Sequence, residues 1–165
     1  MIVFDASTLI ILAKSSILRE VLTHHKAVIP SMVQRECTVD ETREDAKLIA
    51  ELIEESFLKI MEPQQTERIS KIIKDFQLDR GEAIALHLAW ELKAPLATDD
   101  TPTRKACQVL NIRSIIAIAF LEKLTRRGII SPELALEKLK RFKRYGRYNA
   151  ETVEAVRASI KKKGG

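Results

Sequence analysis

The sequence predicts a three-layer α/β/α sandwich with a mostly parallel central sheet and extra helices at the C-terminal end. Short apolar runs alternate with longer helical patterns along most of the chain, as in parallel strands joined by crossover helices. Hydrophobic residues make up 45% and charged residues 31% of the 165 residues, an ordinary balance for one globular domain. Gly and Pro number five each, which argues against a loop-rich β-sandwich.

The strands are predicted from short apolar runs. The first, MIVF, ends at Asp5, and the fourth, PLAT, leads directly into Asp99 and Asp100. Runs of this length without polar alternation are typical of buried parallel strands. We expect strands at 1–4, 27–29, 58–61, 95–98 and 112–115.

Capping residues and apolar stripes predict the helices between these strands. Ser15 or Ser16 can cap the first helix, and Ser31 with Gln34 resembles a capping box for the second. Residues 40–57 form an amphipathic helix because their apolar residues share one stripe. Two further helices are expected at 66–76 and 79–92, and the second is apolar around most of its circumference, which predicts burial.

Helix signals continue to the end of the chain. Pro102 suits the first turn of a helix after the fourth strand, and another helix follows residue 115 and stops at Gly128. Ser131 and Asn149 are N-cap signals for the last two helices, the first of which ends near Gly146. We expect one domain at 1–130 and a basic helical extension, 131–165, packed on it.

Charge is distributed unevenly along the chain. Residues 1–100 contain 12 Lys and Arg against 18 Asp and Glu, a net charge of −6, whereas residues 101–165 contain 16 against 5, a net charge of +11. A basic part beside an acidic one suggests a polyanionic partner, although a solvated helix face explains the charge equally well. If RNA binds there, Lys140, Arg141, Lys143 and Arg144 are the candidate contacts. Tyr145 and Tyr148 could add base stacking or could pack against the protein.

Several functions are excluded or disfavoured. The longest apolar stretch, 115–121, is too short for a membrane span, and the N-terminus lacks the basic region of a signal peptide. Cys37 and Cys107 have no metal-binding spacing and are expected to be reduced thiols, so a cytoplasmic location without a membrane partner is expected. Phosphate-binding loops and serine-nucleophile motifs are absent.

Six acidic residues lie where the ends of parallel strands would bring them together. Asp5, Asp99 and Asp100 directly follow strands, whereas Glu36, Asp79 and Glu82 lie on or beside helices that follow or precede them. Carboxylates gathered without cations favour a hard divalent cation, Mg²⁺ or Mn²⁺, with oxygen ligands. Taken alone, each acid could have a purely structural role instead of binding metal. Asp79 with Glu82 could form a capping box, and Asp99 or Asp100 could cap the helix that follows the fourth strand.

The ordered set of these segments resembles the PIN-domain ribonuclease family. The resemblance rests on IVFDASTLI, IPSMVQRE, LDRGEAIALHLA and ATDD, and it covers roughly residues 1–125. The LDxGE and TDD forms resemble a prokaryotic, largely archaeal branch that includes VapC-like toxins. The resemblance implies a PIN-like nuclease domain, and it assigns the catalytic acids to Asp5, Glu36, Glu82 and Asp100. Ser7 or Thr8 matches the small hydroxyl residue that commonly follows the first Asp of the family, and Thr98 matches the Thr of the fourth motif. Ser7 and Thr98 are the candidate substrate contacts.

These observations predict a metal-dependent endoribonuclease that hydrolyses phosphodiester bonds of single-stranded RNA. The candidate metal ligands are Asp5, Asp79, Glu82 and either or both of Asp99 and Asp100. The resemblance further implies the toxin of a toxin–antitoxin pair, with an antitoxin protein as partner, and a homodimer. The alternative is a non-catalytic PIN-like module that binds RNA or protein and whose acids only cap helices.

Overall fold

The computed structural model describes residues 1–165, and at its centre five strands form one sheet. The strand order is β3–β2–β1–β4–β5, and every neighbouring pair runs parallel. The strands are β1 (Ile2–Phe4), β2 (Ala27–Ile29), β3 (Leu58–Ile60), β4 (Leu96–Ala97) and β5 (Ser114–Ile115). Each strand lies within its expected range, and the predicted parallel sheet is confirmed.

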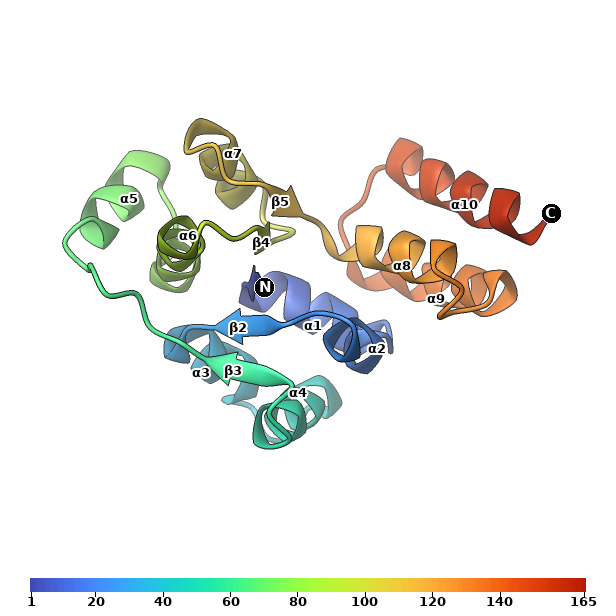
Figure 1. Ribbon diagram of the computed structural model, residues 1–165, viewed down its shortest axis with the longest axis horizontal. Coiled ribbons are helices and arrows are strands. Elements are labelled where there is room, and N and C mark those ends of the chain that lie inside the picture. Colours follow the sequence, from blue (N-terminus) through green and yellow to red (C-terminus); the bar gives the residue numbers. More distant parts are fainter.

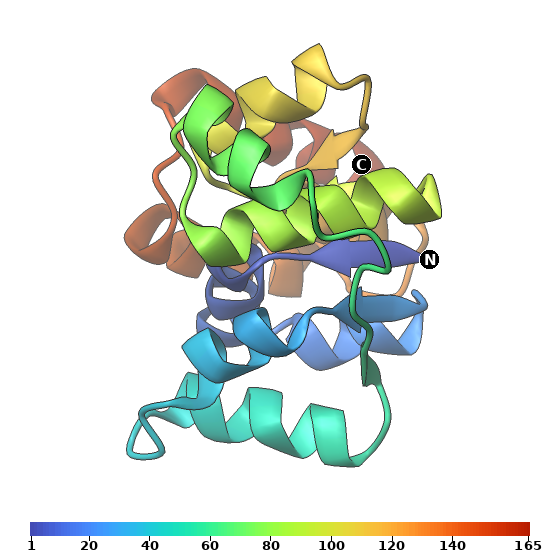
Figure 2. The ribbon, with the colours of Figure 1, turned by 90° about the vertical axis from the view of Figure 1, so that its left-hand side faces the viewer.

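Helices cover both faces of this sheet (Figures 1 and 2). From β1 the chain adds β2 and then β3 on one side of β1, and afterwards it adds β4 and β5 on the other side. Connections between parallel strands are right-handed, so reversing the direction of strand addition moves the connecting helices to the opposite face of the sheet. One layer contains α1 (Ala6–Lys14), α2 (Leu18–Thr23), α3 (Ser31–Thr38), α4 (Glu44–Glu54) and α8 (Ala117–Arg126). The other contains α5 (Ile69–Phe76), α6 (Arg80–Leu92) and α7 (Thr101–Val109). The three-layer sandwich is therefore confirmed.

Helix α1 was not expected from the sequence, and it changes the role of two serines. It begins directly after β1, and the Asp5 side chain caps it by accepting a hydrogen bond from the Thr8 backbone N–H. Ser15 and Ser16 end this helix, with Ser16 at a positive φ of 58°, instead of capping the next one. Residues 9–13 of this segment form an unbroken apolar run, which shows no helical periodicity.

Another expected cap is also absent. Pro30 is the N-cap of α3 and makes no side-chain capping hydrogen bond, so Ser31 and Gln34 do not form a capping box. Instead, the backbone N–H of Ser31 donates to Glu62, 2.7 Å away. A neighbouring segment of the chain has taken over the role of the local cap, as tertiary contacts often do.

Helix α6 is the central helix of its layer. It contacts β1 and β4, and eight of its residues are buried, as its apolar circumference predicted. On the other face, the rings of Phe4 from β1 and Phe120 from α8 stack with their centroids 5.6 Å apart. This continuous apolar core holds the sheet between its two helical layers and makes the sheet edge a rigid platform.

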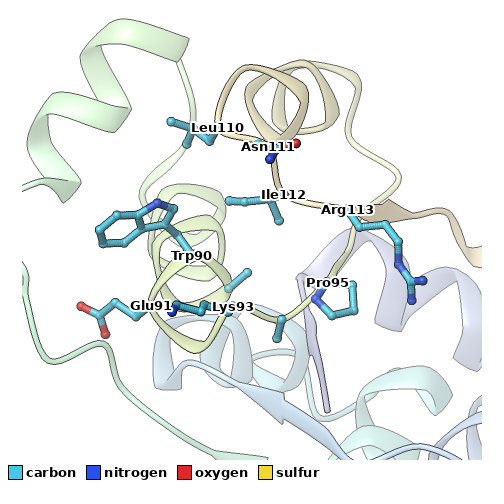
Figure 3. Close-up of a pocket in the computed structure, with 10 residues that line it drawn as sticks. Trp90, Glu91, Lys93, Pro95, Leu110, Asn111, Ile112 and Arg113 are labelled. Atoms are coloured by element: carbon cyan, nitrogen blue, oxygen red, sulfur yellow. The ribbon is translucent and has the colours of Figure 1, made fainter.

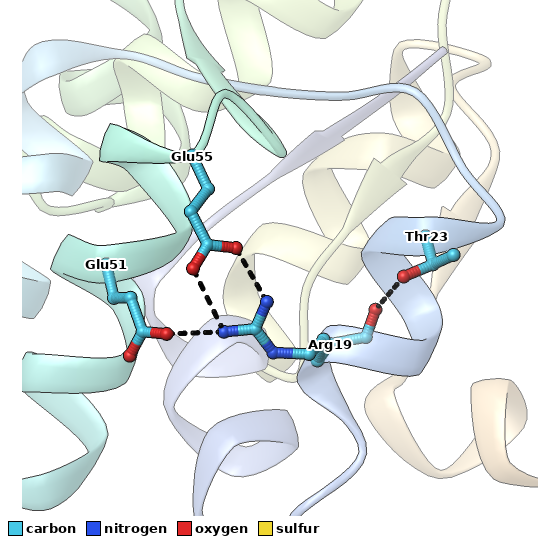
Figure 4. A network of polar contacts seen from close by, with 4 residues as sticks. All are labelled: Arg19, Thr23, Glu51 and Glu55. Carbon is cyan, nitrogen blue, oxygen red and sulfur yellow. Dashed lines mark hydrogen bonds and ion pairs between the residues drawn. The ribbon is translucent and has the colours of Figure 1, made fainter.

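An exposed ion-pair network joins α2 to α4 (Figure 4). Arg19 of α2 donates to Glu51 and Glu55 of α4, and each shortest N–O distance is 2.6 Å. All three side chains are largely exposed, so water screens the attraction and the network contributes little to stability.

The last two helices, α9 (Pro132–Tyr145) and α10 (Ala150–Gly164), pack against α8, and α9 also contacts α1. Ser131 and Asn149 cap them through the backbone N–H groups of Leu134 and Thr152, as the sequence indicated. The loop between the two helices runs along the carboxyl edge of the sheet, where it reaches the acidic residues.

Candidate active site

The acidic residues gather at the carboxyl edge of the sheet because β1 and β4 are neighbours. Val3 pairs with Leu96 and Phe4 with Ala97, so both strands end at the same level. The residues that follow them therefore lie side by side. In open parallel sheets this edge is where functional groups collect.

Asp5 is held on all sides at the end of β1. Its Oδ1 accepts hydrogen bonds from Ser7 Oγ at 2.7 Å and from Thr8 N at 3.0 Å, and its Oδ2 accepts one from Thr98 Oγ1. The residue is only 2% exposed. This burial raises the pKa of Asp5 to about 7, although the three hydrogen bonds oppose the rise. Ser7 and Thr98, expected to contact substrate, thus orient Asp5.

Asp99 ties three separate segments together. Its Oδ1 accepts from Tyr148 Oη at 2.6 Å, and its Oδ2 accepts from Thr8 Oγ1 at 2.7 Å and from the backbone N–H of Ala117 at 2.9 Å. Burial raises the pKa of Asp99 while these hydrogen bonds oppose the rise. Both of its oxygens accept hydrogen bonds, as both oxygens of Asp5 do, so either carboxylate would bind a metal ion through an oxygen that already accepts a hydrogen bond.

Asp100 has one oxygen free. It is the N-cap of α7, and its Oδ2 accepts hydrogen bonds from Thr103 N at 2.8 Å and Thr103 Oγ1 at 2.7 Å. Its Oδ1 has no hydrogen-bond partner within the protein. Asp100 therefore combines the capping role considered in the sequence with a carboxylate oxygen available to a ligand.

Glu82 lies among other carboxylates at the start of α6. Asp79 is the N-cap of this helix, and Glu82 accepts a hydrogen bond from the Asp79 backbone N–H at 2.9 Å, the glutamate half of a capping box. Burial raises the pKa of Glu82, and repulsion from Asp100, Asp79 and Glu36 adds to the rise. The cap that the sequence suggested is present and is part of the acidic cluster.

Glu36 reaches this cluster from α3, and a glycine makes room for it. A Cβ atom at Gly81, in the first turn of α6, would lie 2.2 Å from Glu36 Oε1. Burial and repulsion from Asp79 raise the pKa of Glu36. Sequence reasoning missed Gly81, although a glycine inside a helix has a conformational cost and was a signal that something approaches closely.

The six acids form no ion pair with a basic side chain. None of Asp5, Glu36, Asp79, Glu82, Asp99 and Asp100 takes part in any ion pair of the protein. Uncompensated carboxylate oxygens of this kind are the donor set of a hard divalent cation. No three His, Cys, Asp or Glu side chains are placed to hold one ion together as they stand. The donor chemistry fits Mg²⁺ or Mn²⁺, and binding requires some of these side chains to turn.

A pocket of about 380 Å³ opens over this cluster. Glu82, Asp99 and Asp100 line it, together with Ser7. Asp5 does not line the pocket but is bonded to Ser7, immediately behind the wall. The pocket gives solvent and a ligand access to three of the six carboxylates.

A larger pocket, of about 610 Å³, lies at the opposite edge of the sheet (Figure 3). Its wall includes Pro95 and Arg113, which precede β4 and β5, and also Trp90. Glu91 is its single acidic residue, and Glu91 binds the backbone N–H groups of Gln64 and Gln65. This pocket therefore has no acidic cluster of its own.

Comparison with known proteins agrees with this geometry. A family model described as a PIN domain, DUF3368, matches residues 1–162. The chain belongs to the PIN-domain family. No curated protein and no solved structure matches it. The resemblance to PIN domains and the predicted fold class are thus confirmed, and the match extends through the C-terminal helices.

Membership of the PIN-domain family makes this a nuclease-type fold, and nucleases of this family typically use divalent metals. None of the helices is both long enough and apolar enough to cross a membrane.

The basic residues predicted to contact RNA do not line the acidic pocket of this PIN domain, although Arg144 lies beside the pocket residue Tyr145. Lys140, Arg141, Lys143 and Arg144 are exposed on α9, and none of the four lines the pocket. Arg141 donates to Ser16 Oγ at 2.7 Å. The cations that do line the pocket are Arg104 of α7 and Arg147 of the loop after α9, and Arg104 had no signal in the sequence.

Proposed function

We propose that this PIN domain is a Mg²⁺- or Mn²⁺-dependent endoribonuclease that hydrolyses phosphodiester bonds of single-stranded RNA. The observation that carries the proposal is the gathering of six acids at the carboxyl edge of the sheet without one ion pair. The negative charges of such carboxylates repel one another, and this repulsion destabilises the folded protein unless a cation binds among them.

Each acid has a role in this proposal. Asp5, Glu82 and Asp100 hold the metal ion, with Asp5 fixed by its three hydrogen bonds and Asp100 offering its free Oδ1. Glu36, displayed over Gly81, helps to hold a second ion or orients the attacking water. Asp99 and Asp79 position their neighbours. When bound, the metal would activate water and neutralise charge on the phosphate.

The proposal is tested by cleavage of a labelled single-stranded RNA with Mn²⁺, with Mg²⁺ and with EDTA. The sharpest variant is Asp100→Asn, because asparagine caps helices as well as aspartate does but removes the charge. Asp75→Asn, on the exposed surface of α5, is the matched control. We expect metal-dependent cleavage that Asp100→Asn loses and Asp75→Asn keeps.

One observation favours the non-catalytic alternative. Asp5, Asp79 and Asp100 are all N-caps, which is what acids with a purely structural role would be. The Asp100→Asn variant separates the two functions, because it preserves the cap. No metal-dependent cleavage by the unmodified protein would favour a binding module, whereas full cleavage by Asp100→Asn would overturn the role given to Asp100 in the ribonuclease.

A role as the toxin of a toxin–antitoxin pair, an antitoxin partner, a homodimer and a cytoplasmic location remain predictions of the resemblance and the composition. Growth arrest on expression of the active protein, but not of Asp100→Asn, would support the toxin role. Sedimentation equilibrium of the purified chain would test the homodimer.

A further inference from the structure

The acidic pocket has a second wall of different chemistry. Arg104 and Arg147 line the pocket together with Tyr145 and Tyr148. Both arginines are exposed, and neither forms an ion pair or a side-chain hydrogen bond. Each therefore presents a full set of guanidinium N–H donors at the mouth of the pocket. A planar guanidinium matches the oxygens of a phosphate better than any other side chain.

The backbone position of Arg147 is fixed relative to the acidic cluster by the next residue, Tyr148. The Tyr148 hydroxyl donates to Asp99 Oδ1 at 2.6 Å, and the Tyr148 ring lies 6.4 Å from that of Phe142. Gly146 permits this turn, because a Cβ atom there would lie 2.1 Å from Tyr148 Cε2. The loop between α9 and α10 is thus fastened over the carboxyl edge, and Arg147 is fastened with it.

Arg104 comes from a different segment. It lies in the first turn of α7, which Asp100 caps, and its charge adds to the hydrogen bonds that oppose the burial-driven rise in the pKa of Asp99. Two arginines from distant parts of the chain therefore line the same pocket as the acids. The tertiary fold brings them together, and they do not belong to one basic helix face.

Tyr145 adds an aromatic surface to this wall. It is 39% exposed, and Lys14 Nζ and the Arg144 guanidinium lie 5.6 Å and 5.4 Å from its ring centroid. An exposed aromatic ring among cations is the arrangement by which proteins bind single-stranded nucleic acid, since bases stack on the ring while cations contact the backbone.

We propose that Arg104, Arg147 and Tyr145 form the RNA-binding rim of this site. The two arginines bind phosphates that flank the phosphate held at the acids, and Tyr145 stacks a neighbouring base. This inference rests on the proposed ribonuclease function and goes beyond it by assigning substrate contacts to three residues that line the pocket and not to Lys140, Arg141, Lys143 and Arg144, which do not line it.

The test measures binding of a fluorescently labelled single-stranded RNA by anisotropy in EDTA, over a series of salt concentrations. The variants are Arg104→Gln, Arg147→Gln and Tyr145→Leu. Arg113→Gln is the matched control, because it removes an exposed arginine at the opposite edge of the sheet (Figure 3). Thermal melting followed by circular dichroism checks that each variant is folded.

The two kinds of contact should differ in their salt dependence. Each arginine variant should weaken binding by about tenfold and flatten the slope of log K against log salt by about 0.7, since one phosphate contact is lost. Tyr145→Leu should weaken binding by about fivefold or more while leaving the slope unchanged, because stacking releases no counterions. Arg113→Gln should match the unmodified protein.

Failure of this inference and failure of the proposed function give different results. If the unmodified protein cleaves RNA but the rim variants keep its affinity and slope, the rim assignment is wrong and the ribonuclease stands. An equal loss in Arg113→Gln would also overturn the rim, because it would indicate general surface charge. If the rim variants lose RNA affinity but the unmodified protein shows no metal-dependent cleavage, the rim assignment stands and the ribonuclease proposal is wrong.

Discussion

At the scale of single residues, Asp5 is the most constrained side chain of the site. It is buried, and three donors from both neighbouring strand ends fix its two oxygens. An asparagine can retain this geometry, because its amide oxygen can accept from Ser7 and Thr8 while its NH₂ group donates to the Thr98 hydroxyl. Replacement therefore removes the charge without requiring the fold to change.

We accordingly expect Asp5→Asn to lower the rate of RNA cleavage by about a hundredfold or more, since the metal ion would lose its most rigid ligand. Single-turnover cleavage in Mn²⁺ measures the rate, and circular dichroism checks the fold. A folded Asp5→Asn protein with undiminished activity would contradict the role given to this residue.

Asp5 should also make the metal-free protein sensitive to pH. Burial raises the pKa of Asp5 from 3.8 to about 7, so the folded state favours the protonated form. The stability that this proton contributes is complete below about pH 4 and is lost as the pH rises to about 7, by a few kcal/mol. In EDTA, the unfolding free energy should fall more steeply across this range in the unmodified protein than in Asp5→Asn. Parallel urea-denaturation profiles would be evidence against this.

At the scale of elements, two glycines allow one segment to approach another. Gly81 lets α3 bring Glu36 against the first turn of α6, and Gly146 lets the loop after α9 fold back onto the sheet edge. In the first case the atom in the way is the tip of a flexible side chain, so it can move aside without disturbing the helices.

Gly81→Ala should therefore separate activity from stability. Alanine favours the helix by up to about 1 kcal/mol, so the melting temperature should hold or rise. The Glu36 carboxylate must move, and cleavage should fall by about tenfold or more. The control is Glu36→Gln, alone and combined with Gly81→Ala. If the two single changes impair cleavage additively, Gly81 acts through something other than Glu36.

Tyr148→Phe tests how much the hydrogen bond from Tyr148 to Asp99 stabilises the loop between α9 and α10. It removes the hydroxyl that donates to Asp99 Oδ1 and should reduce the unfolding free energy by about 1–2 kcal/mol, measured in urea. Tyr145→Phe is the matched control, since the Tyr145 hydroxyl makes no hydrogen bond within the protein. Equal stability of the two variants would indicate that the bond to Asp99 contributes little.

At the scale of the whole molecule, the six acids form no ion pair within the protein, so metal binding should stabilise the fold. Because the ion binds the native arrangement, Mn²⁺ at a hundred times its dissociation constant would add about 2.7 kcal/mol. For a chain of this size, the melting temperature would rise by about 5–10 °C. The double variant Glu82→Gln/Asp100→Asn should show little of this rise. A melting temperature indifferent to millimolar Mn²⁺ would count against a metal site.

The sequence by itself determined the parallel sheet, most helix boundaries and the six acids, because each depends on features read along the chain. Apolar runs predict buried strands, and Ser131 and Asn149 predict the starts of the helices that they cap. An acid directly after a strand must lie at the carboxyl edge of the sheet. Helix α1 was not predicted, because the unbroken apolar run at residues 9–13 shows no polar face from which a helix could be recognised.

Only the tertiary structure decided how the site is assembled. It distinguished Asp99, whose oxygens are occupied by Tyr148, Thr8 and Ala117, from Asp100, which keeps one free. It also brought Arg104 and Arg147 to one pocket and left the basic face of α9 outside it. These relations join residues far apart in the chain, and they depend on how helices pack on the sheet. Local periodicity and capping carry no information about that packing.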